Sequence, residues 1–399
     1  MIGRNMSVSD HRRTITTAAT AVVTMMLTAT GASAYAEPPS ANTAASASVE
    51  PGELIELAEN YLQMRADMLT SVHPTPRSAS ARLGATRAMA SGVQEELAAL
   101  GEKGQRYREV DGGYTRAEVE VETSSAELNE RTATLRLTEH TRLYLPMTRQ
   151  EVEDGAPEYE ESSLARTMTF TRNADDEWLL SSDEVEAGGG PTPTTQATGL
   201  NLVDDDGGGT PDEDEGSKGS ASDTAALPEN GIEYIKPAVT ASYNYSKMVS
   251  YANKYWKKHN SAYRTYGNDC TNFISQAVHA GGWGPKGGAL IQRKSNKYWF
   301  YGPAKPLTSY TWAGAENWYW FAKKHSKRTK PLDNVWKMAS ADVLQADFDR
   351  NGKIDHTMIV TKKYKGTPYL TYHTSDTHNK SLKKILSDYP RALWYAHRT

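Results

Sequence analysis

One segment of the 399-residue chain combines a cysteine with residues that begin a helix. Asn268 and Asp269 are helix-capping residue types, and the apolar residues after Cys270 recur with helical spacing until Gly281-Gly282, where the helix should end. Unpaired backbone N–H groups and the helix dipole favour an anion at a helix N-terminus. We therefore expect Cys270 to be an ionised nucleophile, rather than a small buried hydrophobe, with its own N–H available to an oxyanion.

A thiolate nucleophile needs a general base that later protonates the leaving amine. His356 is the best candidate, because it follows Asn351-Gly352, the preferred dipeptide of a tight hairpin turn, and opens a strand-like run. A structural histidine is the alternative. A third group usually orients the imidazole. We expect His373, on the next predicted strand, to do so, and Asp376 is its rival.

The same region also matches the front of a calcium loop. From Asp347 to Asp355, oxygen-bearing residues stand at positions 1, 3, 5 and 9, with glycine at position 6. The twelfth position is Met358 instead of a bidentate Glu, and the hairpin turn explains these residues without a metal. A zinc site built from His356, His373 and His378 is weaker still. We expect neither a metal nor a cofactor in catalysis. Calcium binding by Asp347 to Asp355 is kept as an alternative to the metal-free turn.

The first residues have the pattern of an export signal. His11-Arg12-Arg13 precedes a Thr/Ala-rich apolar run and the small-residue site Ala34-x-Ala36, so residues 1–36 are predicted to be a secretory signal peptide. A membrane anchor is the alternative, but the run is short. We expect a secreted, extracellular protein, either free or associated with the cell wall, with no membrane span after signal removal. The single cysteine excludes an internal disulfide.

Composition divides the rest of the chain. We expect a disordered start at 37–50, a small α+β domain of unknown role at 51–185, a disordered acidic linker at 186–230 and a catalytic α+β domain at 231–399. Hydrophobic periodicity places the elements. The predicted helices are 54–69, 78–100 and 245–256, and the predicted strands are 117–121, 133–138, 166–171, 177–180, 343–348, 354–361, 369–373 and 393–397.

The net charge of −4 hides a strong asymmetry. Residues 231–399 hold 27 Lys and Arg against 10 Asp and Glu, and the remainder holds 18 against 39. A basic module outside a cell attracts anionic wall polymers or stem-peptide carboxylates. The alternative is that the two halves simply attract each other. No nucleic-acid-binding motif accompanies the charge, so we expect no nucleic-acid partner.

Several motifs resemble the putative amidase domain family, a papain-like group related to NlpC-type and CHAP domains. They are Asp269–Gln276, Ala280-Gly281-Gly282, the Asp349–His356 stretch and Tyr372-His373-Thr374, within 243–397. The resemblance implies a papain-like α+β fold, a Cys–His dyad with a third polar residue, and cleavage of amide bonds, often in cell-wall peptides. One departure is Ala341-Asp342, where the family pattern opens the strand with Gly-Asp.

These observations favour a secreted cysteine amidase or peptidase that cleaves amide bonds, in peptidoglycan or other peptides, through a thioester acyl-enzyme. The alternative is a non-catalytic basic protein that binds the wall or another partner. The two hypotheses differ in whether Cys270 reacts.

Overall fold

The computed structural model describes residues 51–186, 188–197, 207–225 and 243–399. The expected signal peptide and disordered start lie outside these residues. Residues Val49–Thr399 form one compact unit. No helix among the described residues has the length and apolar character that a membrane crossing requires.

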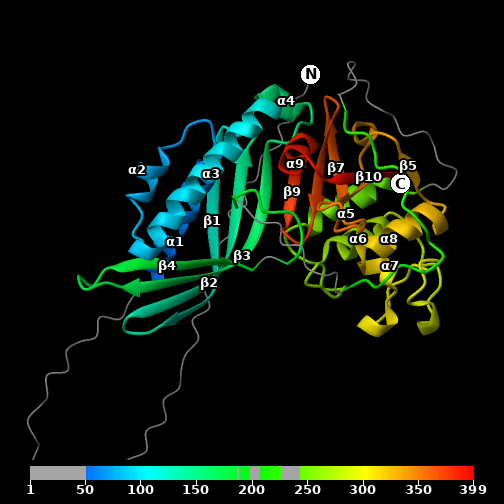
Figure 1. The fold of residues 1–399 in the computed structure, drawn as a ribbon, viewed down its shortest axis with the longest axis horizontal. Helices are drawn as coiled ribbons and strands as arrows, with labels where there is room; N and C mark the ends of the chain where they lie inside the picture. The colour runs from blue at the N-terminus through cyan, green and yellow to red at the C-terminus, as the bar shows by residue number, and fades with distance from the viewer. Residues whose placement is uncertain (1–50, 187, 198–206, 226–242) are drawn as a thin grey trace, which may run out of the picture. The chain divides into compact units, whose positions relative to one another are not determined.

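The first part of the chain places helices before an antiparallel meander, as predicted. Its elements are α1 (Pro51–Asp67), α2 (Pro76–Ser80), α3 (Arg87–Asp111), β1 (Arg116–Leu128), β2 (Thr132–Tyr144), α4 (Arg149–Glu153), β3 (Tyr159–Arg172) and β4 (Trp178–Val185). Leu62 of α1 and Leu97 of α3 share a buried cluster with Leu135 and Phe170 of the sheet. The helices therefore cover one face of these strands (Figure 1).

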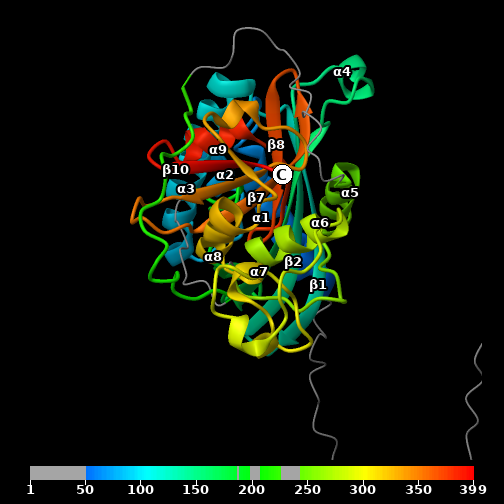
Figure 2. The same cartoon turned by 90° about the vertical axis from the view of Figure 1, so that its right-hand side faces the viewer.

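The second part likewise places most of its helices before its strands. Its elements are α5 (Tyr245–Tyr255), α6 (Cys270–Ala280), α7 (Tyr310–Ala313), α8 (Ala315–Trp320), β5 (Lys330–Leu332), β6 (Val343–Asp347), β7 (His356–Tyr364), β8 (Thr367–Tyr372), β9 (Thr377–Ser381), α9 (Leu382–Asp388) and β10 (Leu393–Arg398). Short helical turns lie at Leu290–Gln292, Lys305–Leu307, Phe321–His325 and Val335–Lys337. Figure 2 shows α5 to α8 gathered together beside the strands of this part.

One sheet runs through both parts of the chain. Its order is β1-β2-β3-β9-β8-β7-β6-β10-β5, with β4 also paired to β3. The two parts meet where β3 pairs with β9 through Glu161↔His378 and Ser162↔Thr377. Every pair of neighbouring strands in this sheet, as far as the described residues extend, is antiparallel, so the α+β class is confirmed.

Two apolar clusters cover opposite faces of the C-terminal strands. Ile359 and Val343 pack with Phe273 and Ile274 of α6. The residues that alternate with them, which are Leu344, Met358, Val360 and Leu370, pack with Leu382 and Ile385 of α9. Because successive strand residues point to opposite faces, this division fixes which side chains face α6.

The segment predicted to be a disordered linker is partly packed. Residues 189–191 and 193–195 are buried, and residues 207–225 also include buried positions. Pro191 O accepts a hydrogen bond from Ser375 Oγ at 3.1 Å, and the Thr192 N–H donates to Tyr389 at 2.6 Å. Local composition predicts exposure here, but contacts with distant residues of the C-terminal part satisfy these backbone groups.

Candidate active site

Cys270 is the first residue of α6, as the sequence predicts. Asp269 is the N-cap, the helix runs through Ala280, and Gly281 is the C-cap. Cys270 is 1% exposed. Cys270 therefore lies at the end of this eleven-residue helix where the first-turn backbone N–H groups, which have no partner within the helix, and the helix dipole favour a negative charge.

A buried hydrogen bond fastens the start of α6 to β7. Thr271 Oγ1 lies 2.8 Å from Thr357 Oγ1, and Thr357 Oγ1 also accepts from Gln345 Nε2 at 3.1 Å. Gln345 Nε2 in turn donates to the Ala315 carbonyl at 2.9 Å. Since Thr271 follows Cys270 and Thr357 follows His356, this bond sets the backbones of the predicted nucleophile and base side by side.

The imidazole of His356 occupies an apolar environment on the other face of the sheet. Alternation along β7 places it with Met358, away from Thr357. The rings of Tyr372 and Phe348 are its neighbours, at centroid distances of 5.1 and 6.2 Å. Neither ring nitrogen has a hydrogen-bond partner in the structure, and burial lowers the pKa of His356 to about 3. His356 is therefore neutral, and it is not hydrogen-bonded to Cys270.

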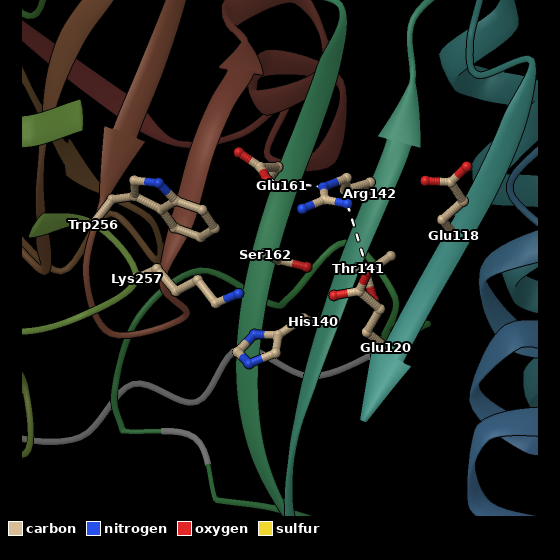
Figure 3. A pocket seen from close by; sticks show the side chains of 9 residues that line it. All are labelled: Glu118, Glu120, His140, Thr141, Arg142, Glu161, Ser162, Trp256 and Lys257. Carbon is tan, nitrogen blue, oxygen red and sulfur yellow. Dashed lines mark hydrogen bonds and ion pairs between the residues drawn. The ribbon is translucent and has the colours of Figure 1, made fainter. Parts of the chain in front are cut away.

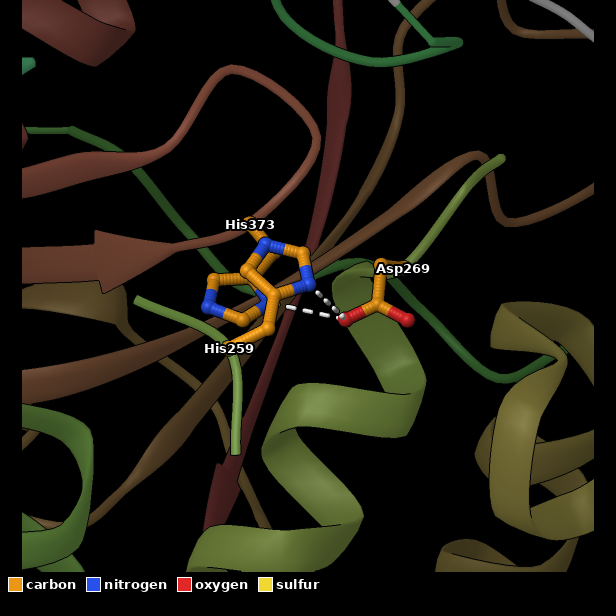
Figure 4. Close-up of side chains that lie close together, drawn as sticks. All are labelled: His259, Asp269 and His373. Carbon is orange, nitrogen blue, oxygen red and sulfur yellow. Dashed lines mark hydrogen bonds and ion pairs between the residues drawn. The ribbon is translucent and has the colours of Figure 1, made fainter. Parts of the chain in front are cut away.

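His373 makes different contacts from those predicted. Its Nδ1 lies 2.7 Å from Asp269 Oδ2 (Figure 4), and its Nε2 lies 2.8 Å from the Tyr255 carbonyl oxygen. Its ring stacks on the ring of Phe273 of α6, with 3.9 Å between the two ring centroids. Alternation along β8 turns Tyr372 toward His356 and His373 toward α6. His373 therefore orients the start of α6, and the prediction that it orients His356 is not met.

The electrostatic surroundings of His373 favour its charged form. Burial alone would lower the pKa of His373, but Asp376, Asp269 and the Tyr255 carbonyl together raise it above 6.5. Both ring nitrogens face acceptors, which an imidazolium satisfies as a double donor. Asp376, the rival third group, instead lies 3.2 Å from Nε2 of His259. No hydrogen bond joins Asp376 to His356.

His259 is a member of this cluster that the sequence analysis missed. Its ring stacks on His373 at 4.1 Å, and its Nδ1 lies 3.8 Å from Asp269 Oδ2 (Figure 4). His259 stands in the loop after α5, without a motif or a periodic position that marks it. Donor atoms of His259, Asp269 and His373 are close enough to consider a metal. However, the direct bond between His373 and Asp269 already uses two of the atoms that a metal would need.

The loop that leads to His356 differs from the predicted two-residue turn. β6 ends at Asp347 and β7 begins at His356, so residues 348–355 form the connection. Asp347 Oδ2 accepts from the Gly352 N–H at 3.0 Å, and Asp355 Oδ2 accepts from the Phe348 N–H at 2.7 Å. These carboxylates hold a longer loop, and the prediction of a tight Asn-Gly hairpin is wrong.

A segment from the predicted linker lies against the loops that flank α6. A Cβ added to Gly188 would clash with the carbonyl oxygen of Gly267 and approach Thr374. A Cβ added to Gly190 would lie 3.6 Å from Cε1 of His356. The segment containing these glycines therefore approaches both the loop before Cys270 and the imidazole of His356, which limits access to both.

A separate hollow lies between the end of α5 and the sheet. Trp256 and Lys257 face His140 and Arg142 of β2 and Glu161 of β3 (Figure 3). Its lining contains neither Cys270 nor His356. Its mixed charges are largely paired with one another, as between Arg142 and Glu161 at 3.2 Å. We therefore place the candidate active site at α6 and β7.

Comparison with known proteins supports an amidase domain in the C-terminal part. Residues 242–396 match the family described as "Putative amidase domain", a range that includes Cys270, His356 and His373. The chain is 30% identical over 159 residues to the uncharacterized protein YhbB of Bacillus subtilis, covering 39% of this chain and 49% of YhbB. It is 29% identical over 172 residues to the uncharacterized protein YjcM of the same organism, covering 41% of this chain and 38% of YjcM. The chain thus spans half or less of these relatives.

Two solved structures share weak similarity. The Kfla4162 protein from Kribbella flavida is 19% identical, with 34% of this chain and 88% of that chain covered and a TM-score of 0.20. An Ntf2-like protein involved in plasmid conjugation is 10% identical, with 53% of this chain and 66% of that chain covered and a TM-score of 0.20. Neither carries an argument about the fold.

Proposed function

We propose that the C-terminal part is a papain-like cysteine hydrolase of amide bonds, with Cys270 as nucleophile and His356 as general base. The amidase-family match supports hydrolysis of an amide, and the helix N-terminus supports a thiolate at Cys270. The observation that carries the proposal is the 2.8 Å bond between Thr271 and Thr357. It holds the residues that follow Cys270 and His356 in contact, so the two reacting side chains start from neighbouring backbone positions.

The reaction would proceed in two halves. The imidazole of His356 takes the proton of the Cys270 thiol, the sulfur attacks the amide carbonyl, and N–H groups at the start of α6 stabilise the oxyanion. The imidazolium then protonates the amine as the C–N bond breaks, which leaves a thioester. In the second half the imidazole takes a proton from water, the resulting hydroxide attacks the thioester carbonyl, and the C–S bond breaks to release the carboxylic acid while the proton returns to the Cys270 sulfur. In the structure the imidazole of His356 lies on the face of the sheet opposite to α6, so it reaches the Cys270 sulfur only if the backbone at the start of β7 rearranges together with the side chain. The imidazole has no hydrogen bond to break in this rearrangement.

His373 would have a positioning role. Its bond to Asp269 Oδ2 fixes the residue directly before Cys270, while Asp269 Oδ1 accepts from the Tyr266 N–H and from Asn272 Nδ2, both at 2.9 Å. Asp269 therefore links three segments at the helix start. This arrangement would keep the orphan N–H groups of α6 in place when the oxyanion forms.

The substrate proposal depends on the sequence. Residues 1–36 have the pattern of an export signal, and the excess of Lys and Arg in residues 231–399 favours anionic material outside the cell. We propose peptides of the cell wall as substrates and a secreted or wall-associated location. A non-catalytic basic binding protein is the second candidate. The near-complete burial of Cys270 and the missing bond between Cys270 and His356 favour it.

The test compares wild-type protein with Cys270→Ala on purified muropeptides, with products identified by mass spectrometry. Removal of the nucleophile should lower the rate of amide cleavage at least about 10³-fold. Equal product from both proteins would contradict cysteine catalysis. Cleavage of other peptides but not of muropeptides by the wild type would contradict the wall substrate alone.

A further inference from the structure

The loop 348–355 and the two residues at its ends gather carboxylates at one point. Asp347, Asp349 and Asp355 each place an oxygen within 4.8 Å of the others. Together with Asn351 and Gly352, they reproduce the first nine positions of a calcium-binding loop. Gly352 has a φ of +87°, the conformation that this sixth position requires and that glycine adopts without strain.

One oxygen in this cluster lacks a donor. Asp347 is 0% exposed, and its Oδ2 accepts from the Gly352 N–H, but its Oδ1 has no hydrogen-bond partner in the structure. A buried carboxylate oxygen without a partner is unfavourable, because it has lost its hydration without replacement. A cation among the three carboxylates would supply the missing interaction.

A fourth carboxylate reaches the loop from α8. Glu316 Oε2 accepts a hydrogen bond from the Ile354 N–H at 2.8 Å. It stands beside a loop whose twelfth position, Met358, has no ligand oxygen. Lys218 lies 2.9 Å from Glu316 Oε2 and also donates to the Gly352 carbonyl. Lys218 therefore neutralises Glu316, whereas Asp347, Asp349 and Asp355 form no ion pair among the described residues, and the basic side chains of the loop itself, Arg350 and Lys353, are exposed.

We propose that this loop binds one Ca²⁺, with oxygens of Asp347, Asp349, Asn351 and Asp355 as side-chain ligands and Glu316 in place of the missing twelfth ligand. All of these are hard oxygen donors, without a histidine or cysteine, which favours Ca²⁺ over transition metals. The dissociation constant should be about 10⁻⁴ to 10⁻³ M, as in extracellular calcium modules. The ion would order the residues directly before His356, whether or not the protein is an amidase.

The test uses the full chain after treatment with a chelator, titrated with CaCl₂ in a calorimeter and melted with and without the ion. We expect one Ca²⁺ per chain and, at 10-fold or greater excess over the dissociation constant, a rise in Tm of roughly 3 °C. Asp349→Asn keeps a ligand oxygen but removes one negative charge, so it should weaken binding at least several-fold, lower the rise in Tm and still fold, because Asp349 is exposed. The matched control is Asp214→Asn, in a second acidic cluster formed with Asp212 and Glu215, which should keep both responses.

A spectroscopic readout locates the ion. The Trp320 indole donates to Glu316 Oε1 at 2.7 Å, so Tb³⁺ in the loop should emit when Trp is excited. This emission should be weakened in Asp349→Asn and competed by Ca²⁺. No uptake of Ca²⁺ by the wild type would overturn the proposal and indicate that Lys218 and the basic residues of the loop balance its charge. Loss of binding in Asp214→Asn with retention in Asp349→Asn would overturn it too.

Discussion

At the scale of single residues, two equally buried imidazoles have opposite electrostatic surroundings. His356 has aromatic neighbours and no hydrogen-bond partner, so burial lowers its pKa. His373 is as deeply buried, but Asp376, Asp269 and the Tyr255 carbonyl outweigh the effect of burial. The charged ring of His373 is suited to hold a carboxylate, which supports its positioning role. The neutral ring of His356 has a nitrogen free to accept a proton, but its low pKa makes it a weak base until an anion such as the Cys270 thiolate lies beside it.

The charged state of His373 predicts a pH-dependent stability. Its pKa is raised above 6.5 in the folded protein, so its contribution is complete below pH 6.5 and is lost as pH rises through the folded-state pKa. The groups that face it are Asp269 and His259 at the start of α6 and after α5, and Asp376 after β8. The wild type should exceed His373→Asn in Tm most strongly at pH 6 and progressively less toward pH 9. A difference that grows with pH would contradict this account.

At the scale of elements, α6 and β7 form the candidate site, and the sequence predicted both. The N-cap residue type before Cys270 and the paired glycines at 281 and 282 marked the helix bounds correctly. The strand beginning near residue 354 was also correct to within two residues. Local periodicity could predict these elements because their apolar faces pack in the core.

The partners of these elements could not be predicted in the same way. The Asp269–His373 bond joins residues 104 apart, and nothing local to either residue reveals the other. His373 was predicted to orient His356 from the next strand, with Asp376 as the rival, yet strand alternation turns Tyr372 toward His356, and Asp376 contacts His259. The strand β9 and the helix α9 were missed because polar residues such as Lys380 and Lys384 are buried there by pairing with Asp388 and Asp111.

The close approach of residues 188–190 to the start of α6 predicts a change in access. In Gly188→Ala, the new Cβ would meet backbone atoms of Gly267, so the segment must shift. We expect iodoacetamide to alkylate Cys270 several-fold faster than in wild type, measured by intact mass, since the chain has one cysteine. Gly92→Ala, which meets nothing within 4 Å, is the control. An unchanged rate in Gly188→Ala would show that this segment does not limit access.

At the scale of the whole molecule, one sheet joins segments that composition divides. The β3–β9 pairs are reinforced by buried polar contacts between the two parts. Lys380 Nζ lies 2.9 Å from Thr194 Oγ1 and 2.9 Å from Asp388 Oδ2, and Tyr107 donates to Asp388 at 2.7 Å. Lys380 and Asp388 can be buried because their opposite charges are paired with each other. The acidic and basic halves of the chain are therefore held by specific contacts as well as by overall attraction.

The continuous sheet predicts that the two parts unfold together. Leu97→Ala removes a fully buried side chain of α3 and should cost about 2–5 kcal/mol of unfolding free energy. In a Trp178→Phe background every remaining Trp lies in residues 243–399. Urea unfolding followed by Trp fluorescence should still shift to lower urea, in step with far-UV circular dichroism. A fluorescence transition unmoved by Leu97→Ala would indicate two independent domains.

The most direct test of the account compares two histidines that are buried in similar environments. His356 and His397 are both fully or nearly fully buried, both lack hydrogen-bond partners in the structure, and burial lowers the pKa of each to about 3. His397 lies on β10 beside Trp318 and Tyr319 of α8.

The measurement is the rate of amide cleavage of muropeptides by His356→Asn and by His397→Asn, each checked for folding by its Tm. The account predicts a loss of about 10²- to 10⁴-fold in His356→Asn, the contribution of a general base, and a rate near wild type in His397→Asn. A folded His356→Asn that cleaves at the rate of His397→Asn would contradict the assignment of His356.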